Sequence, residues 1–283
     1  VSNTSVEHPI IHLPPLFGVD LSVTKHVLML WIVAVFVFGV ITWCTRRYLR
    51  QERPVPTGLM SAVEAVVLYI RDSIVLPNVG RKFLNTWTPL ILTFFFFILT
   101  SNAIGLVPMF DVLGVVDRFI LHTSDHSLLN QVLHGGTTAT ANYNVTAALA
   151  IITFLAIMVA GTKAHGFLQH WKNLAPPGLA WPLYFILVPI EIMGMLVKPF
   201  ALTMRLAANM TGGHIAILAI LSFVFIAESL FESASVGVAV GLFVSVPLAV
   251  GISALEIIVV LVQAYVFTLL TAVFIGMAIN VHH

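Results

Sequence analysis

The sequence predicts an all-α membrane protein, and three features carry that prediction. Of its 283 residues, 59% are hydrophobic and only 9% are charged, whereas about a quarter of an ordinary soluble domain is charged. The mean hydropathy is +1.02. The apolar residues form runs that reach or exceed the roughly twenty residues that a membrane-spanning helix needs. We therefore expect about five membrane-embedded helices and one amphipathic surface helix.

The first crossing is predicted over residues 27–45, and the charges after it indicate the orientation of the chain. Arginines follow at positions 46, 47, 50 and 53, and such clusters mark the cytoplasmic ends of membrane helices. Residues 1–24 are then an extracytoplasmic segment, and residues 25–283 form one integral membrane domain. The polar start without an initiator Met leaves open that a leader has been removed. Residues 59–76 include Glu64, Arg71 and Asp72, which favours an amphipathic surface helix over a crossing.

The next two crossings are predicted over residues 89–107 and 144–161. Between them, residues 109–140 carry acidic residues and histidines but only one basic residue, Arg118, so this loop is expected outside. Lys163 and Lys172 follow the second of these crossings. The positive charges of the short loops therefore agree with the first assignment, which puts the N-terminus outside and the C-terminus in the cytoplasm.

Two very long apolar stretches, 179–227 and 236–280, complete the chain, and a polar patch separates them. Each is roughly twice as long as a perpendicular crossing requires. In an antiparallel hairpin, facing residues have a constant sum of residue numbers; 214 with 256 gives 470 and 205 with 263 gives 468. Half of either sum falls within the polar patch. We therefore expect a hairpin over about residues 179–280 that pairs His214 with Glu256 and Arg205 with Gln263.

The same hairpin is expected to be strongly tilted. About thirty residues separate Arg205 from the turn, or about 45 Å of helix, whereas the hydrocarbon core is about 30 Å thick. An arginine near the midplane then requires a tilt of roughly 70° if the helix is continuous. Kinks are possible at Pro189, Pro199 and Pro247.

Polar residues inside these apolar stretches are the candidate functional residues. Ionisable groups at membrane depth are costly and are usually functional, although satisfied structural pairs are the alternative. At 100° per residue, Glu191 and Lys198 lie about 40° and 20° from Arg205, and His214 lies about 180° away. Small residues flank the arginine at 201, 208 and 212, which allows another helix to come close. The candidates are Glu191, Lys198, Arg205, Asn209, His214, Glu256 and Gln263.

The residues around Arg205 resemble the arginine-bearing helix of subunit a of F-type ATP synthases. The run from Lys198 to Met210 reads KPFALTMRLAANM, close to the family pattern KP-SLTLRL-x-x-NM. Residues 101–108, SNAIGLVP, look like the N-x-x-G-x-x-P helix end of that family. Residues 140–150 and 255–267 look like its helix after the outer loop and its last helix. The resemblance covers most of the chain from Gly58 onward.

The resemblance implies a stator subunit in the membrane sector of a rotary ATP synthase. It would form two aqueous half-channels that carry protons to and from a rotating ring of c subunits. Arg205 would face the ring carboxylates and separate the half-channels, because a cation that keeps its charge lowers the pKa of a carboxylate passing nearby. The other positions have implied places: Asn209 and Gln263 beside the arginine, His214 and Glu256 in the outer half-channel, Glu191 in the inner one, and Lys198 with a weaker role.

The implied partners are the c ring, the peripheral-stalk b subunits, the rest of the F1Fo complex and membrane lipid. The chain has no phosphate-binding glycine loop, so ATP chemistry is expected in other subunits and the chain is not an enzyme by itself. No cofactor or metal is expected, because the single Cys44 excludes a cysteine cluster and surface histidines such as His122, His126 and His134 usually bind nothing. The expected location is a bacterial plasma membrane, with an organellar energy-transducing membrane as the alternative.

Two positions depart from common forms of the family. His214 and Glu256 are exchanged relative to members with Glu at the first position and His at the second, and the exchange keeps one acid and one imidazole for a proton relay. Asn142 stands where many members have Asp.

Other functions remain open or are excluded. A stand-alone secondary transporter would usually show internal repeats, which are absent here. A scaffold with paired charges is a further alternative. Nucleic acid is not an expected partner, because the 13 Lys and Arg form no basic face and the net charge is only +1. The choice between H⁺ and Na⁺ depends on the ring, which belongs to another chain.

Overall fold

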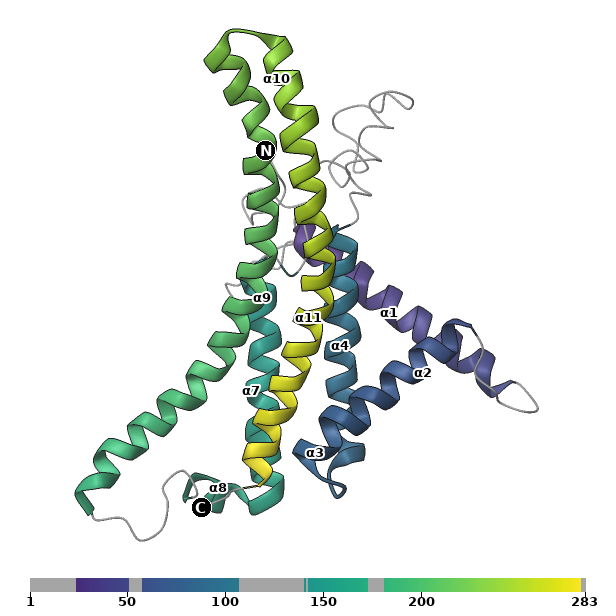
Figure 1. Cartoon of the computed structure of the whole chain (residues 1–283). Coiled ribbons are helices and arrows are strands. Elements are labelled where there is room, and N and C mark those ends of the chain that lie inside the picture. The colour runs from purple at the N-terminus through teal and green to yellow at the C-terminus, as the bar shows by residue number, and fades with distance from the viewer. Residues whose placement is uncertain (1–23, 51–57, 107–139, 141, 173–180, 281–283) are drawn as a thin grey trace. The chain divides into compact units, whose positions relative to one another are not determined.

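The computed structural model describes residues 24–50, 58–106, 140, 142–172 and 181–280, which are almost entirely helical (Figure 1). Among them, five helices are long and apolar enough to cross a membrane. Four are α1 (Lys25–Leu49), α4 (Leu84–Leu106), α7 (Tyr143–His165) and α9 (Trp181–Phe231). The fifth is the continuous run of α10 (Ala234–Val240), η4 (Gly241–Ser245) and α11 (Val246–Ile279). The predicted all-α membrane fold is confirmed.

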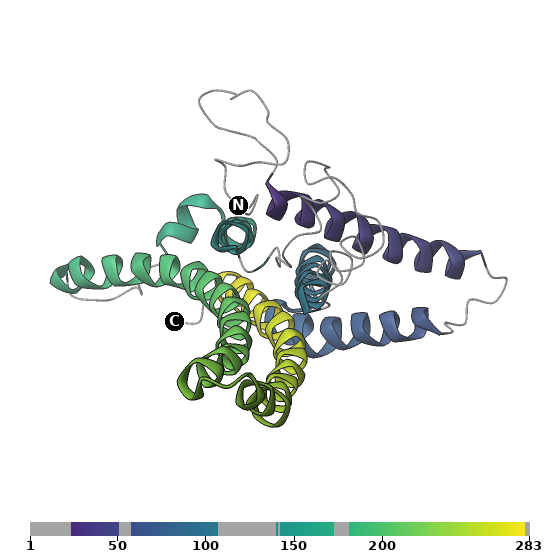
Figure 2. The same ribbon diagram turned by 90° about the horizontal axis from the view of Figure 1, so that it is seen from above.

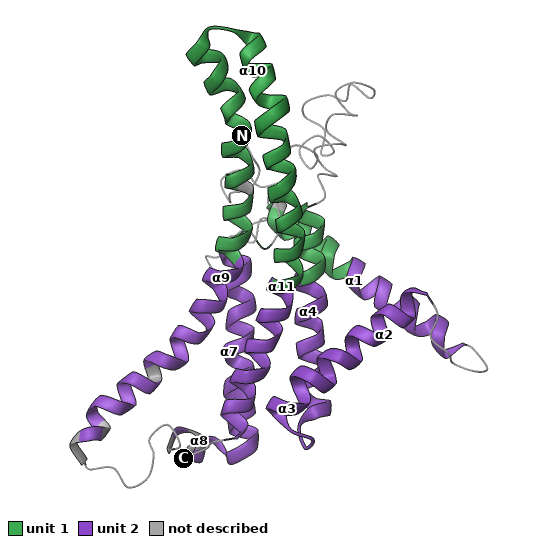
Figure 3. Cartoon of the chain, in the orientation of Figure 1, with its two compact units in different colours: residues 1–35, 99–142, 207–262 green, residues 36–98, 143–206, 263–283 purple. Residues whose placement is uncertain are grey.

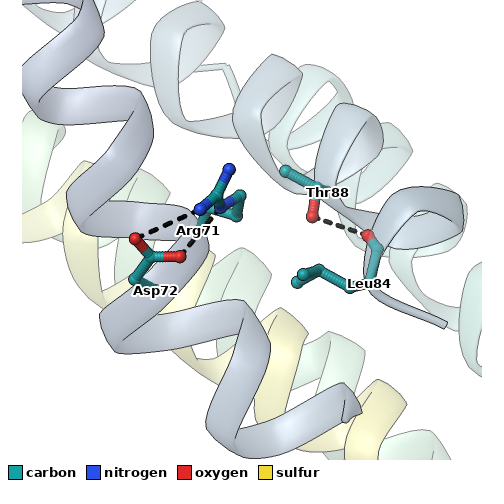
Figure 4. Close-up of polar contacts among 4 residues, drawn as sticks. All are labelled: Arg71, Asp72, Leu84 and Thr88. Atoms are coloured by element: carbon teal, nitrogen blue, oxygen red, sulfur yellow. Dashed lines mark hydrogen bonds and ion pairs between the residues drawn. The ribbon is translucent and has the colours of Figure 1, made fainter. Parts of the chain in front are cut away.

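The helix predicted to lie on the membrane surface is α2 (Leu59–Tyr69), continued by η1 (Ile70–Val75) and α3 (Leu76–Val79). It is not among the five spanning candidates, and Figures 1 and 2 show α2 running crosswise to α4 and α7. On η1, Arg71 and Asp72 form an exposed ion pair, with Nε and Oδ1 2.8 Å apart (Figure 4). Ile74 and Val75 are buried beside them. Charges outside and apolar residues inside are what an amphipathic helix requires.

The chain divides into two compact units, which we describe separately (Figure 3). Unit 1 comprises residues 1–35, 99–142 and 207–262, and unit 2 comprises residues 36–98, 143–206 and 263–283. Four long helices, α1, α4, α9 and α11, therefore contribute residues to both units. Residues 1–23, most of the predicted outer loop 109–140 and its histidines lie outside the described part of the chain.

The core of unit 2 is an apolar cluster contributed by η1, α3, α4, α7 and α11. In lipid such a cluster stabilises mainly through van der Waals packing, because the lipid tails are themselves apolar. The cluster consists of Ile70, Ile74, Val75, Val79, Trp87, Ile91, Ala156, Ile157, Ala160, Ala272, Ile275 and Ile279.

The short helix α8 (Phe167–Lys172) was not predicted from the sequence. It follows α7 after Gly166, whose φ of 87° ends α7.

Unit 1 contains the antiparallel hairpin that the sequence predicted. Its turn lies at Glu232, with φ of 48°, and Ser233, and the two arms run side by side in Figures 1 and 2. Glycines let the arms approach closely: a methyl group at Gly237 would stand 2.9 Å from Cβ of Glu228. A methyl group at Gly241 would stand 3.1 Å from Cγ2 of Val224. Small residues at helix contacts are typical of membrane proteins.

Two segments of π-helix precede prolines. η1 ends at Val75, two residues before Pro77, and η4 ends at Ser245, two residues before Pro247. A proline inside an α-helix lacks the N–H that would bond the carbonyl four residues earlier. A wider π-turn shifts the bonding pattern to pairs five apart, as in the bond from the Val246 N–H to the Gly241 oxygen. The possible kink at Pro247 is thus accompanied by a π-segment, while α9 continues through Pro189 and Pro199.

Candidate functional site

Arg205 lies in the middle of α9, and its side chain is turned away from the chain's own core. Its neighbours Leu202 and Leu206 are 1% and 0% exposed, whereas Arg205 itself is exposed. Among the described residues, no hydrogen bond or ion pair reaches its guanidinium. An arginine in a hydrocarbon environment needs an anion, a carbonyl or water. On an outward face of α9, Arg205 is therefore a cation that the described residues leave without a partner.

The surface beside Arg205 is built from small side chains. Ala201, Ala208 and Gly212 are exposed like the arginine, and a methyl group at Gly212 would meet no atom within 4 Å. The predicted small-residue stripe is therefore left open by this chain. Only 6% of the most apolar part of α9 is buried, against 44% for α7. α9 leaves most of its surface to lipid or to another protein.

Two further charges of α9 belong to unit 2. Lys198 is half-buried and its Nζ lies 5.6 Å from the centre of the Phe274 ring on α11. Such a cation–π contact stabilises by about 0.5–2 kcal/mol depending on desolvation. Glu191 is exposed. The structure thus gives Lys198 a partner within the chain and gives Arg205 and Glu191 none among the described residues.

In unit 1, Glu256 of α11 packs against the backbone of α9 at Gly213. A methyl group at Gly213 would overlap the Glu256 carboxylate and stand 2.8 Å from its Cδ and 3.1 Å from its Cγ. The numbers 213 and 256 sum to 469, within one of the value predicted for His214 with Glu256. The hairpin therefore brings Glu256 to the residue next to His214 in sequence. The side chain of His214 lies outside what the structure describes.

The two predicted amides lie in different environments. Gln263 on α11 is only 3% exposed, and Asn209 on α9 is exposed. The sum of 468 for Arg205 with Gln263, both in unit 2, is one less than the sum at Gly213 and Glu256 in unit 1. The pairing of Arg205 with Gln263 stays a prediction.

Sequence reasoning missed a buried polar group in unit 1. Ser101 and Asn102, near the end of α4, are 1% and 0% exposed, and Thr140 donates a hydrogen bond from Oγ1 to Oδ1 of Asn102. Nδ2 of Asn102 and Oγ of Ser101 have no hydrogen-bond partner. Buried polar atoms are nearly always hydrogen-bonded to protein or to ordered water. The sequence signal for this buried polar group is an Asn within an apolar run, which in the sequence stood out only as part of the family motif.

No metal site is found among the described residues, where no three His, Cys, Asp or Glu side chains come together. His122, His126 and His134 lie outside those residues. The candidate site is therefore a set of charges and amides on two helices, with Arg205 and Glu191 facing outward.

Comparison with known sequences shows the family of this chain. A sequence model of the family described as ATP synthase A chain matches residues 27–276. The chain belongs to this family. It is 39% identical over 267 residues to ATP synthase subunit a 2 of Chlorobium luteolum, covering 94% of this chain and 68% of the relative. It is 40% identical over 271 residues to ATP synthase subunit a 2 of Prosthecochloris aestuarii, covering 95% and 72%. With ATP synthase subunit a of Chloroherpeton thalassium the identity is 38% over 276 residues, covering 95% and 71%.

Membership in the ATP synthase A chain family confirms the resemblance drawn from residues 198–210. As a subunit a of F-type ATP synthases, the chain is a multi-pass membrane component of that complex, and its function is in proton transport. Family membership also decides against a stand-alone secondary transporter.

Proposed function

We propose that this subunit a forms two aqueous half-channels that lead protons to and from a rotating ring of c subunits, with Arg205 between them. The ring carries carboxylates that pick up and release the protons. The chain itself is a non-catalytic stator, and the chemistry of ATP takes place in other subunits of the complex. Its expected location is a bacterial inner membrane, with the N-terminus outside and the C-terminus in the cytoplasm.

The observation that carries this proposal is the exposed guanidinium of Arg205, which has no ion pair among the described residues, on a helix suited to span a membrane. A permanent charge in that position needs an anion, a carbonyl or water, and no anion among the described residues lies against it. A ring carboxylate that passes within a few ångströms has its pKa lowered by the cation and releases its proton. The open stripe of Ala201, Ala208 and Gly212 lets a partner helix approach. Because arginine does not deprotonate in proteins, the barrier between the half-channels persists.

The half-channels are assigned to the remaining polar residues. His214 and Glu256 form an outer relay, since an imidazole and a carboxylate exchange protons near neutral pH. The contact of Glu256 with Gly213 supports this assignment, because it places the carboxylate beside the residue that precedes His214. Glu191 lines the inner half-channel from its exposed position on α9. Asn209 and Gln263 orient groups beside the arginine, and Lys198, held by Phe274, contributes more weakly.

The proposal includes three partners. The c ring covers the Arg205 face of α9, the b subunits of the peripheral stalk hold the stator, and lipid covers other apolar faces such as that of α1, where Val35 and Phe38 are 71% and 73% exposed.

The test replaces Arg205 with Ala and, as a matched control, with Lys in the assembled complex. We expect Arg205→Ala to abolish ATP-driven proton pumping and coupled ATP synthesis, while the complex still assembles. Arg205→Lys keeps a cation that is able to lose its proton when desolvated, so it should retain at most a small fraction of activity. Pumping is measured by quenching of a pH-sensitive dye in inverted vesicles, and assembly by co-purification with the ring and the soluble head.

Coupled synthesis that survives in a fully assembled Arg205→Ala complex would refute the role of the arginine. Purification of an active transporter without a ring would refute the stator assignment.

A further inference from the structure

The carboxyl end of α11 is tied to two other helices of unit 2 by contacts that the proposed proton path does not use. We call this set the carboxyl-end anchor. It consists of Asn78 on α3, His165 at the end of α7, and Gly276, Ile279 and Asn280 at the end of α11. All five belong to unit 2, and the parts of α3, α7 and α11 that carry them are purple in Figure 3. Ile279 also belongs to the apolar core beneath the anchor.

The first contact of the anchor is the close approach of two backbones. A methyl group at Gly276 would overlap the carbonyl of Asn78 and stand 2.8 Å from its carbon and 3.3 Å from its Cα. These are backbone atoms within the turn that joins α3 to Gly80, so they do not yield as a flexible side chain would. By contrast, a methyl group at Gly39, Gly194 or Gly251 would meet nothing within 4 Å. Gly276 is thus a position where only a hydrogen atom fits.

The second contact is a pair of asparagine hydrogen bonds. Nδ2 of Asn280 donates to the Asn78 oxygen at 3.1 Å, one helical turn after Gly276 on the same face. Nδ2 of Asn78 donates to the Ile74 oxygen at 2.6 Å and thereby holds its own turn. The Asn78 carbonyl lies in the last turn of α3, where a carbonyl has no N–H partner within the helix. The side chain that follows α11 therefore satisfies a carbonyl at the end of α3.

The third contact caps α11 itself. Nε2 of His165 lies 2.8 Å from the oxygen of Ile279, the last residue of α11. A carbonyl only accepts, so His165 donates, and its Nε2 carries a proton. His165 is placed there because α7 ends at it, before Gly166. The bond fills one of the orphan carbonyls of the α11 terminus.

We propose that the carboxyl-end anchor fixes α11 along its axis, so that Gln263 keeps its level beside Arg205 while the stator bears the sideways load of the ring. The proposal rests on the proposed function of Arg205. Gln263 lies about 20 Å from Gly276 along the same helix, at 1.5 Å per residue. If α11 shifts by one residue position, Gln263 moves about 1.5 Å along the helix axis and turns by about 100°, so its side chain points to a different side of the helix. The anchor residues are positioning residues, since none of them lies in the proposed path.

The test compares Gly276→Ala with Gly39→Ala, a helix glycine on α1 with open space around it. Hydrogen exchange is measured on peptides covering residues 74–80 and 270–280 of the assembled complex, together with protons pumped per ATP hydrolysed. We expect Gly276→Ala to speed exchange in both peptides by about fivefold or more, the effect of losing one hydrogen bond. The pumping ratio should fall by about threefold or more, because small misplacements of positioned groups are costly. Gly39→Ala should change neither.

A second pair of variants removes only one hydrogen bond and guards against a general folding defect. His165→Gln keeps an N–H donor and should preserve both readouts, whereas His165→Leu should impair both. Failure of Gly276→Ala to assemble, with normal assembly of Gly39→Ala, also supports the anchor, and the His165 pair then decides its role.

Unchanged exchange in Gly276→Ala and in His165→Leu would overturn the anchor. Faster exchange with an unchanged pumping ratio would overturn its positioning role. If Arg205→Ala still couples, the proposed function fails, while the exchange measurement continues to judge the anchor by itself.

Discussion

Arg205 is a charged residue within an apolar stretch, where lipid does not solvate its side chain. Its charge in an apolar run was visible in the sequence, and its exposure on α9 follows from the burial of Leu202 and Leu206 on another face of the helix. The structure adds that no anion among the described residues neutralises it. A fixed charge with no anion beside it among those residues is suited to a partner that comes and goes.

Gly213 supplies a prediction at the same scale. Replacing it with Ala puts a methyl group where the Glu256 carboxylate lies, and the carboxylate must move. We expect Gly213→Ala to slow ATP-driven proton pumping severalfold. The overpacked contact would cost about 1–3 kcal/mol, which is enough to displace the Glu256 side chain. The measurement is the initial rate of dye quenching in inverted vesicles, normalised to the amount of assembled complex.

Gly39→Ala is the control for this variant, since it makes the same chemical change where nothing lies within 4 Å. Wild-type pumping in Gly213→Ala would show that the position of Glu256 does not matter for proton entry. Glu256→Gln should slow pumping as well, because it removes the titrating group and keeps the shape.

Much of the candidate site was predictable from residues alone, and the remainder depended on three-dimensional contacts. Residue-number sums placed Glu256 within one residue of its neighbour on α9, because a hairpin has a nearly constant sum. The burial of Ser101 and Asn102 was not predicted, because their packing depends on helices distant in sequence. The Lys198 contact with Phe274 was likewise hidden, since 76 residues of sequence number separate the two.

At the scale of elements, the sequence predicted the hairpin but placed its turn slightly too late in the chain. The predicted midpoint was near residue 235, whereas the turn lies at Glu232 and Ser233. Near the turn, 224 with 241 and 228 with 237 both sum to 465, and farther along 213 with 256 sums to 469. The π-segment η4 lies between these contacts and adds residues to one arm. This π-turn accounts for part of the increase of four in the sum, and in the sequence Pro247 had predicted only a kink.

The glycines of this hairpin give a prediction about stability. Gly237→Ala should destabilise the hairpin by about 1–3 kcal/mol, because the new methyl group meets Cβ of Glu228 at 2.9 Å and the Val224 oxygen at 3.2 Å. Gly241→Ala should cost less, because its contact is the Val224 side chain, which is able to rotate. Heat-induced loss of the detergent-solubilised complex measures both.

Equal losses for Gly237→Ala and Gly241→Ala would contradict the distinction between backbone and side-chain contacts. A gain in stability at Gly237 would show that the arms do not approach as described.

For the whole molecule, the charge rule and the five spanning helices make one prediction of orientation. In a background in which the free Cys44 is replaced by Ser, Ser235→Cys at the exposed hairpin end should react with an impermeant maleimide added outside intact cells. Ser73→Cys, exposed on η1, should react only in inverted vesicles. The Cys44→Ser parent without an added cysteine is the control.

The opposite labelling pattern would invert the orientation and exchange the outer and inner half-channels. Labelling of both positions from one side would contradict an odd number of crossings between them.

The slight burial of α9 has a consequence for how its sequence evolves. With 6% of its most apolar part covered by its own chain, against 44% for α7, the acceptable side chains on α9 are set largely by lipid and, under the proposed function, by the ring subunit. Substitutions there should appear in evolution together with compensating substitutions in the ring. Transplanting α9 from a distant species should therefore fail unless the matching ring gene is transplanted with it, whereas α7 should be exchangeable within its own gene.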